Sequence, residues 1–285
     1  MLVSVIITTK NEEKNIENCL KSIKEQGYPQ ELIEVIVVDN NSTDKTKEIA
    51  LRYTNQVFDK GPERSAQRNF GVEKSKGEYF LYLDADMTLH KDVIKHCVEK
   101  ISVISATSLV IPAEAGIQVS NPDIVALYIS EIVMGKKFFS QVRRFERSFY
   151  DATVIDCARF IKKSAFQKVG GFDENLTGPE DWDLDKKLRK IGTTALVKTP
   201  IYHNEAEFEL RKYLDKKGYY AKKFDTYIAK WGKNDPDLQK QFGLYYRFLG
   251  VFVEKGKWKK MFAHPLLTFG MFFLRFLVGL KFVLR

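Results

Sequence analysis

The feature that most constrains the fold is a set of three short apolar runs separated by segments with a helical pattern. The runs are Val3–Thr8, Val35–Asp39 and Tyr79–Asp84. Apolar residues recur with a helical period in residues 11–23, 44–52 and 64–73. Strands that alternate with helices at this spacing predict a parallel sheet wound in βαβ units. In such sheets, ligands bind beyond the carboxyl ends of the strands.

Polar residues follow each of the three predicted strands. They are residues 9–12 after the first strand, 39–44 after the second, and Asp84 with Asp86 after the third. Because carboxyl ends of parallel strands share one edge of a sheet, we expect all three clusters on one rim. Local roles are open as well, since Asn11 suits a helix N-cap and Asp39 suits a turn.

Asp84 and Asp86 emerge together from the end of a buried strand. Residues two apart in extended chain point the same way, so two carboxylates roughly 7 Å apart repel by about 2 kcal/mol at an effective dielectric near 20. Mg²⁺ or Mn²⁺ would relieve this repulsion and could hold phosphate oxygens. An ordinary exposed acidic turn is the alternative interpretation.

The net charge of +9 belongs entirely to the C-terminal part of the chain. Residues 205–285 hold 17 basic and 8 acidic side chains, whereas residues 1–204 hold 29 of each. The basic residues alternate with aromatic ones, which suits a nucleic acid, an anionic membrane surface or a phosphate-bearing substrate. A solvated basic face is the alternative.

The sequence also indicates the cellular location. Its three cysteines are far apart and lack CxxC spacing, so they predict neither disulfides nor a zinc site and favour a reducing compartment. The first residues lack the basic leader and cleavage site of a signal peptide. We therefore expect the protein on the cytoplasmic side of the cell membrane, held peripherally or monotopically.

The tail, residues 262–285, is the most hydrophobic part of the chain, and we expect its helix to begin near Pro265. Arg275 would cost about 2.5–3.5 kcal/mol at the centre of a bilayer. A helix lying in the membrane interface is therefore preferred over a span. A re-entrant segment, or a terminal helix packed on the core, stays open.

The middle of the chain carries weaker patterns. We expect strands over residues 108–112, 155–162 and 197–202, and helices over residues 122–134 and 181–191. Residues 138–150 alternate aromatics with arginines. His203 follows the last predicted strand directly.

Five motifs, in this order, resemble the family 2 glycosyltransferases of the GT-A fold. They are residues 3–13 (Val3-Ser-Val-Ile-Ile-Thr-Thr-Lys-Asn-Glu-Glu), residues 37–46 (Val37-Val-Asp-Asn-Asn-Ser-Thr-Asp-Lys-Thr), residues 64–71 (Arg64-Ser-Ala-Gln-Arg-Asn-Phe-Gly), Leu83-Asp-Ala-Asp, and residues 170–184, from Gly170-Gly-Phe-Asp-Glu to Glu180-Asp-Trp-Asp-Leu. The resemblance implies an α/β fold with a doubly wound, mostly parallel, Rossmann-like sheet, followed by a helical, membrane-associating region. It divides the chain into a nucleotide-sugar-binding half (1–115), an acceptor-binding half (116–205), a basic aromatic helical region (206–261) and a hydrophobic tail (262–285).

The resemblance also assigns expected roles to individual residues. The residues expected to bind the nucleotide-sugar donor are Thr8, Asn11, Glu12, Asp39, Arg68, Asp84 and Ala85. The expected ligands of Mn²⁺ or Mg²⁺ are Asp84, Asp86 and His203, with a purely structural histidine as the alternative for His203. Asp181 would be the general base, with Glu180 beside it, although acidic residues also favour a helix N-terminus for simple electrostatic reasons.

The expected activity is inverting transfer of one sugar to a hydroxyl of a lipid-linked or envelope glycan acceptor. Single transfer is favoured because the Gln-x-x-Arg-Trp motif of processive synthases does not follow the helix predicted at residues 181–191. A sugar-1-phosphate nucleotidylyltransferase is an alternative, but residues 8–12 lack the glycines of a phosphate loop. A non-catalytic binder of membranes or nucleic acid is a second alternative; with the transferase, nucleic acid is not an expected partner.

Overall fold

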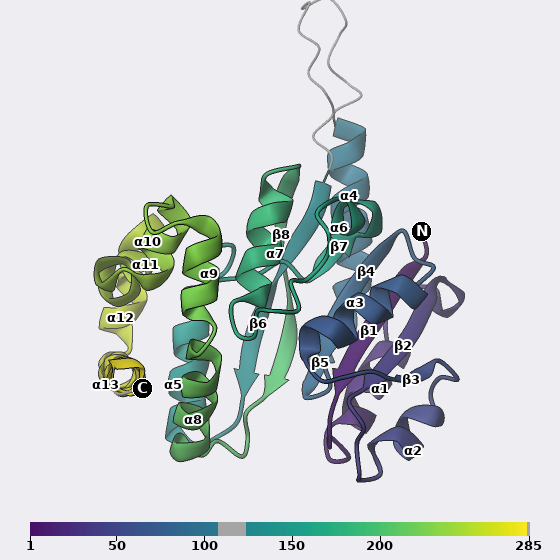
Figure 1. The fold of residues 1–285 in the computed structure, drawn as a ribbon, viewed down its shortest axis with the longest axis horizontal. Coiled ribbons are helices and arrows are strands. Elements are labelled where there is room, and N and C mark those ends of the chain that lie inside the picture. Colours follow the sequence, from purple (N-terminus) through teal and green to yellow (C-terminus); the bar gives the residue numbers. More distant parts are fainter. Residues whose placement is uncertain (108–123, 284–285) are drawn as a thin grey trace, which may run out of the picture.

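A computed structural model describes residues 1–107 and 124–283 of the chain. Eight strands form one mixed sheet in the order β3-β2-β1-β4-β7-β6-β8-β5, and helices cover it on both sides (Figure 1). The strands are β1 (Val3–Thr9), β2 (Ile33–Asp39), β3 (Val57–Asp59), β4 (Tyr79–Asp84), β5 (Met87–Leu89), β6 (Ile124–Met134), β7 (Phe160–Lys162) and β8 (Thr193–Asn204).

The first half of the sheet is the parallel βαβ unit that the sequence predicts. Strands β1, β2 and β4 are buried over most of their length, which explains why the sequence reads as continuous apolar runs. Their register aligns Thr8 with Asp84 and Thr9 with Asp39. The polar ends of these strands therefore share one rim, as expected.

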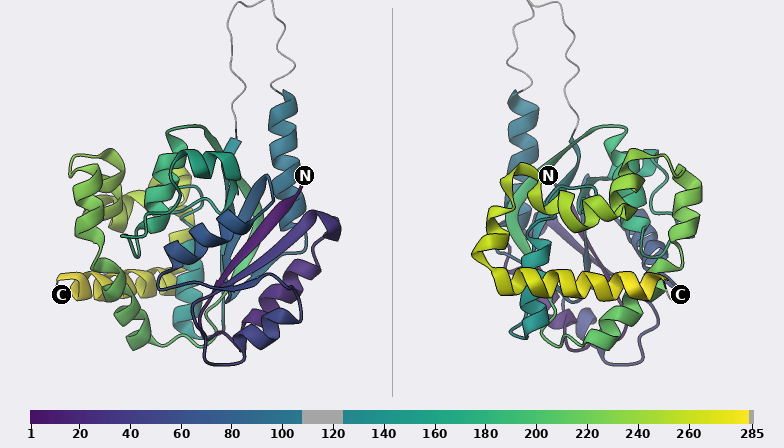
Figure 2. Two further views of the ribbon diagram at one scale, coloured as in Figure 1. Left: turned by 45° about the vertical axis from the view of Figure 1, so that its right-hand side comes forward. Right: turned by 90° about the vertical axis from the view of Figure 1, so that its left-hand side faces the viewer.

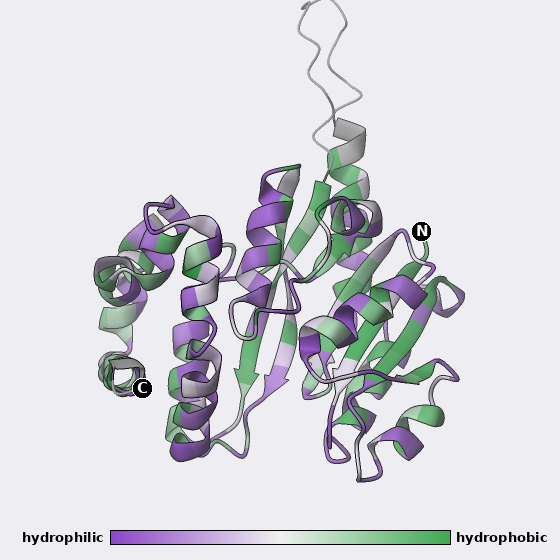
Figure 3. Cartoon of the chain, in the orientation of Figure 1, coloured by the Kyte–Doolittle hydropathy of each residue, from purple (hydrophilic) through white to green (hydrophobic). Residues whose placement is uncertain are grey.

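Helices cover this half on both faces. Apolar side chains of α1 (Ile16–Lys24), α2 (Thr46–Leu51) and α4 (Val93–Thr107) pack on one face, and those of α3 (Arg64–Lys74), α6 (Lys163–Lys168) and α7 (Glu180–Arg189) pack on the other. A short 3-10 turn, η1 (Gln30–Leu32), precedes β2. Figure 3 shows the resulting pattern, with apolar strands between helices of mixed polarity.

The second half of the sheet corrects two of the expectations. The helix expected over residues 122–134 is wrong, because Ile124–Met134 forms β6, which lies between β7 and β8. This strand is buried on both faces, so it lacks the alternation that distinguishes a strand from a helix. The strand expected over residues 155–162 is confined to Phe160–Lys162, while residues 138–147 form the helix α5 (Phe138–Arg147).

Two further expectations concern the N-terminus of the first helix and the region around residue 115. Asn11 does not cap a helix, since α1 begins at Ile16 and Asn11 lies in the left-handed region with a φ of 54°. The strand expected at residues 108–112 and the domain boundary expected at 115/116 lie outside the described residues.

The C-terminal part is helical, as predicted. Its elements are α8 (Leu210–Ala221), α9 (Phe224–Trp231), α10 (Pro236–Phe242), the π-helical turn η3 (Tyr246–Gly250), α11 (Val251–Val253), the turn η4 (Glu254–Gly256), α12 (Lys259–Ala263) and α13 (Pro265–Val283). Helix α13 contacts α5 and α8 and lies across the outside of the molecule (Figure 2). Within the described residues, none of the helices has both the length and the hydropathy required to cross a membrane.

Candidate active site

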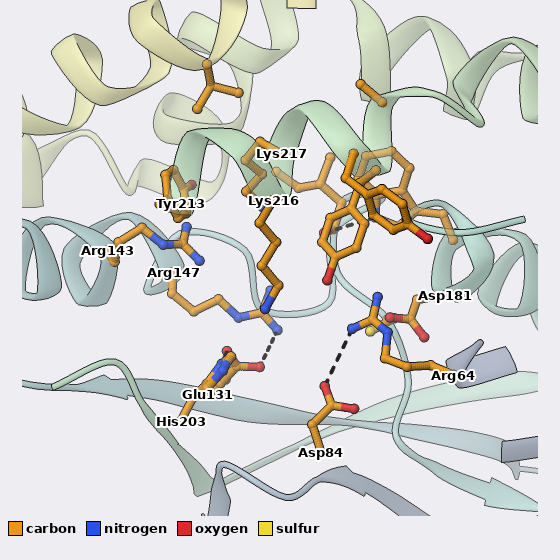
Figure 4. A pocket seen from close by; sticks show the side chains of 18 of the residues that line it. Arg64, Asp84, Glu131, Arg143, Arg147, Asp181, His203, Tyr213, Lys216 and Lys217 are labelled. Carbon is orange, nitrogen blue, oxygen red and sulfur yellow. Dashed lines mark hydrogen bonds and ion pairs between the residues drawn. The ribbon is translucent and has the colours of Figure 1, made fainter. Parts of the chain in front are cut away.

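One cavity of about 930 Å³ extends from the rim of the parallel strands to the underside of α13. Its outer end is lined by the polar residues after β1 and β4, and its inner end by α5, α8 and η3. Figure 4 shows these groups facing one another across the cavity, with Asp84 rising from the sheet and Lys216 and Lys217 descending from α8. The outer and inner ends carry different chemistry.

Three of the expected donor residues lie together at the outer end. The Thr8 hydroxyl donates a hydrogen bond to Asp84 Oδ1 at 3.1 Å, and the amide of Ala85 donates to the carbonyl of Thr8 at 3.2 Å. Thr8, Asp84 and Ala85 all line the cavity. Their proximity follows from the pairing of β1 with β4.

The loops after β1 and β2 hold one another. The Asn11 amide donates to the Ser42 hydroxyl at 2.7 Å, and the Glu12 amide donates to the Thr46 hydroxyl at 2.7 Å. Glu12 lines the cavity, where burial raises the pKa of its carboxyl group. Asn11 is exposed, and its side-chain oxygen accepts a hydrogen bond from the amide of Thr43 at 2.9 Å. Its expected contact with the donor stays a prediction.

Asp39 lies at the end of β2 with its side chain fully buried. Both carboxylate oxygens accept hydrogen bonds from Ser42, at 2.6 Å from the amide and 2.5 Å from the hydroxyl. Asp39 therefore stabilises the turn after β2, which is the alternative role that its sequence context suggests. Its expected contact with a nucleobase stays a prediction.

Arg68 is fully buried and joins the two carboxylates on which the predicted chemistry depends. One terminal nitrogen donates to Asp84 Oδ1 at 3.0 Å and the other to Asp181 Oδ1 at 2.8 Å. The guanidinium group also contacts the rings of Tyr82 and Phe172, 4.5 and 5.2 Å from their centroids. The expectation that Arg68 contacts the nucleotide does not fit this position, because its side chain is enclosed and absent from the cavity wall.

The two acidic residues that open α7 differ in their surroundings. Glu180 is buried and accepts a hydrogen bond from Arg64 at 2.9 Å, whereas the Asp181 side chain is 21% exposed and lines the cavity. Burial and the neighbouring Asp181 raise the pKa of Glu180 in spite of Arg64. Asp181 is thus the more accessible of the pair.

Asp86 meets His203 because β5 pairs with β8, which aligns Met87 with His203. Asp86 Oδ2 lies 3.2 Å from His203 Nε2, and Glu131 Oε1 lies 3.1 Å from His203 Nδ1. Burial alone would lower the pKa of His203, but the two carboxylates outweigh it and raise the pKa to about 10. Glu131 comes from the strand that the sequence misassigned as a helix, so no local signal pointed to it.

This corner fits a divalent cation in part. Asp86 Oδ1 is buried without a hydrogen-bond partner in the described structure, which is the state expected of a ligand oxygen. Asp84, in contrast, already faces Arg68 and Arg64. In the part of the chain that the structure describes, no three acidic, histidine or cysteine side chains are grouped to hold a metal ion.

The inner end is lined by cations from distant parts of the chain. They are Arg143 and Arg147 from α5, Lys217 from α8, Arg247 from η3 and Arg275 from α13. The sequence drew attention to the arginines of residues 138–150 and to the basic C-terminal part, and the fold brings side chains from both to one end of the cavity. That convergence depends on long-range packing, for which the sequence carries no local pattern.

Comparisons with known proteins agree with this architecture. The family model described as "Glycosyl transferase family 2" matches residues 4–170. Glycosyltransferase AglE of Haloferax volcanii is 39% identical over 199 residues, which are 67% of this chain and 62% of AglE. The chain thus spans slightly less than two thirds of the length of that relative.

Two solved structures resemble the fold. The mannosyltransferase PcManGT of Pyrobaculum calidifontis, in complex with GDP-Man and Mn²⁺, superposes with a TM-score of 0.60 at 20% identity, covering 99% of this chain and 86% of that one. TarS 1-349 of S. aureus, in complex with UDP-GlcNAc, gives a TM-score of 0.56 at 20% identity, covering 90% and 76%.

Proposed function

The chain belongs to glycosyl transferase family 2 and has the GT-A fold, and on that premise we propose that it moves one sugar from a nucleotide-sugar donor to a lipid-linked or envelope glycan acceptor. One observation carries the proposal. A single cavity joins an acidic end, lined by Asp84, Asp86 and Asp181, to a basic end beneath the apolar helix α13. An acidic end suits a metal-bound diphosphate, and a basic, partly apolar end suits an acceptor of different chemistry.

Asp181 is the proposed general base. Its hydrogen bonds to described residues all fall on Oδ1, from Arg68 and from the Tyr82 hydroxyl at 3.3 Å, so Oδ2 can accept a proton. In the proposed step, the acceptor oxygen forms a bond to the anomeric carbon while the bond from that carbon to the diphosphate breaks. The acceptor proton passes to Asp181, and the sugar is inverted because attack is opposite the leaving group.

The donor end supplies charge for the leaving diphosphate. Asp86 and His203 would hold Mn²⁺ or Mg²⁺ once His203 has lost the proton that Asp86 and Glu131 stabilise on it, and the bound ion would neutralise the diphosphate oxygens as a Lewis acid. Phosphate oxygens of the donor would supply ligands that the protein lacks. Lys216 lies at the same end, where the charges of Asp86 and Asp84 help to raise the pKa of its ammonium group against the effect of burial. It would remain charged and pair with a phosphate.

The donor site can be tested by thermal stabilisation with UDP, GDP, CMP and dTDP sugars, with and without Mn²⁺ or Mg²⁺. Ligand at 100 times its Kd should add about 2.7 kcal/mol of stability. We expect stabilisation by one nucleotide class only, dependent on metal, abolished by EDTA and lost in Asp86→Ala. Exchange of the surface residue Asp59, which pairs with Lys47 in solvent, provides the matched control Asp59→Ala. Stabilisation that is equal with and without metal would contradict the proposed site.

The proposed location is the membrane surface, and α13 supports it. Its outer side chains Leu266, Phe269, Phe273, Phe276 and Leu280 are 43–70% exposed and follow each other at intervals of three and four residues, which puts them on one stripe. Trp258 and Phe262, shortly before this helix, are exposed as well, and the exposed Lys259 and Lys260 lie between them in the sequence. Apolar and aromatic side chains bordered by lysines suit an anionic bilayer interface.

Co-sedimentation with vesicles of 30% anionic lipid tests this location. Phe269→Ser with Phe276→Ser should release most of the protein, because two exposed rings no longer enter the interface. Leu51→Ser is the matched control, since Leu51 is 60% exposed on α2, outside the stripe. Undiminished sedimentation of the double variant would refute the role of α13.

A further inference from the structure

The inner end of the cavity holds more positive charge than its own carboxylates can balance. Arg147 is set aside, because Asp156 and Glu131 pair with it at 2.7 and 3.3 Å. Among the described residues, the carboxylates that the other four cations, Arg143, Lys217, Arg247 and Arg275, face at this end are those of Glu146 and Glu205. Arg143 pairs with Glu146 at 2.8 Å and with Glu205 at 3.5 Å, and Arg275 pairs with Glu146 at 2.9 Å. When all four are protonated, two carboxylates leave an excess of two positive charges. Burial and Arg143 lower the pKa of Lys217 to about 7, so an anion bound beside it would also favour its protonated form.

The excess is located on Lys217 and Arg247. Among the described side chains, none forms an ion pair or hydrogen bond with the ammonium of Lys217 or the guanidinium of Arg247. Lys217 instead lies over the ring of Tyr213, 5.3 Å from the centroid, and Arg143 lies 5.2 Å from the same centroid. Two like charges that share one ring are costly unless an anion lies between them.

The same pocket has an apolar side. Leu244, which precedes η3, and Phe248, within η3, line it together with Leu274 and Val278 of α13. The opposite face of α13 carries the exposed stripe described above. The basic group therefore lies between the acidic donor end and an apolar wall that adjoins the proposed membrane face.

We propose that Lys217 and Arg247 form an anionic subsite for a phosphate group of the acceptor, whose hydrocarbon chain lies along α13. This inference rests on the proposed function and specifies its acceptor class. A phosphate ester or a diphosphate matches an excess of two charges, and the guanidinium fork of Arg247 suits phosphate oxygens. The apolar wall distinguishes a lipid phosphate from free phosphate.

Binding of dodecyl phosphate to the full chain, measured by titration calorimetry, tests the subsite. Inorganic phosphate tests the anion alone, and dodecyl maltoside tests the chain with a neutral headgroup. We expect dodecyl phosphate to bind at least tenfold more tightly than either. Equal binding of dodecyl maltoside would overturn the anionic subsite, and equal binding of inorganic phosphate would overturn its assignment to a lipid.

Variants locate the site. Lys217→Met and Arg247→Met should each weaken dodecyl phosphate binding at least tenfold, whereas Lys217→Arg should retain most of it. Lys212→Met is the matched control, because Lys212 lies on the same helix with its side chain 79% exposed. Unchanged affinity in both methionine variants would overturn the proposal.

Donor binding, measured on the same samples, separates this proposal from the proposed function. The methionine variants should bind the metal-dependent nucleotide within twofold of the wild type, which also reports that they are folded. A wild type that binds dodecyl phosphate but no nucleotide sugar would refute the transferase and leave the subsite. Metal-dependent nucleotide binding by the wild type, with unchanged dodecyl phosphate affinity in both methionine variants, would support the transferase and refute the subsite.

Discussion

Replacement of Arg68 by methionine should destabilise the protein and disable its chemistry together. Arg68 is the buried cation between Asp84 and Asp181, with a third carboxylate, Glu180, 3.8 Å away. Removing one partner of a buried ion pair costs about 3–5 kcal/mol, because the remaining charges are left without compensation. The methionine replaces the stem of the arginine, so little of the loss should come from packing.

The size of the effect can be checked by denaturant and thermal unfolding. For a protein of this size, a loss of about 3–5 kcal/mol lowers Tm by roughly 10 °C. Arg52→Met is the matched control, because Arg52 pairs with Glu48 in solvent, and exposed pairs contribute about 0–1 kcal/mol. Asp84→Asn added to Arg68→Met should restore about 1–2 kcal/mol by removing a charge that has lost its partner.

The acid side of the stability profile reports the same interaction. Burial would raise the pKa of Asp84, but Arg68 and then Arg64 lower it well below its usual value. A carboxyl group with a depressed folded-state pKa stabilises the fold above its unfolded pKa of about 3.9 and loses that contribution as the pH falls further. The slope below pH 4 should therefore be smaller in Arg68→Met. A loss under about 1 kcal/mol with an unchanged acid slope would refute the reasoning.

Three further predictions concern other parts of the chain. Asp181→Asn should lower kcat by about 10²–10⁴-fold with donor affinity nearly unchanged, because the acceptor proton loses its base; steady-state kinetics beside donor titration would refute this if kcat stayed within tenfold. Gly71→Ala should lower the unfolding free energy by about 1–3 kcal/mol, because a Cβ there would lie 2.4 Å from Ile6 Cγ2. An unchanged unfolding free energy in chemical denaturation would contradict this. Burial and Arg143 lower the pKa of Lys217 to about 7. Between that value and about 10.4, the unfolded state binds one proton more than the folded state, so the unfolding free energy rises with pH by up to about 1.4 kcal/mol per unit. Lys217→Met should lack this rise, and parallel stability profiles of the two proteins would contradict the prediction.

The elements that the sequence predicts well are those whose signal is local. Strands β1, β2 and β4 combine apolar runs with polar ends. Thr8 and Asp84 are far apart along the chain, and the parallel register of β1 and β4 brings them together. The hydrophobic pattern did not identify β6 as a strand, because burial on both faces removes the alternation of apolar and polar residues. The contact of Glu131 with His203 could therefore not be predicted, because it depends on β6 pairing with β8.

Charge placement was predicted only in outline. The excess of basic residues after residue 204 is visible in the sequence, but neighbouring lysines on one helix have different environments. Lys216 is influenced by the acidic donor end, whereas Lys217 is influenced by Arg143 and Arg247. Adjacent residues on a helix point about 100° apart, so each lysine reaches a different end of the cavity.

Arg275 shows why α13 can be apolar without spanning a membrane. Its side chain is only 7% exposed, pairs with Glu146 and lies over the ring of Phe252, 4.6 Å from the centroid. The charge that would be costly at the centre of a bilayer is instead compensated inside the protein, on the face of the helix that packs against α5. Because Arg275 fixes which face turns inward, the stripe from Leu266 to Leu280 must face outward. In the proposed function, one helix would then contact lipid on one side and line the inner end of the cavity on the other, in the same cavity as Asp181.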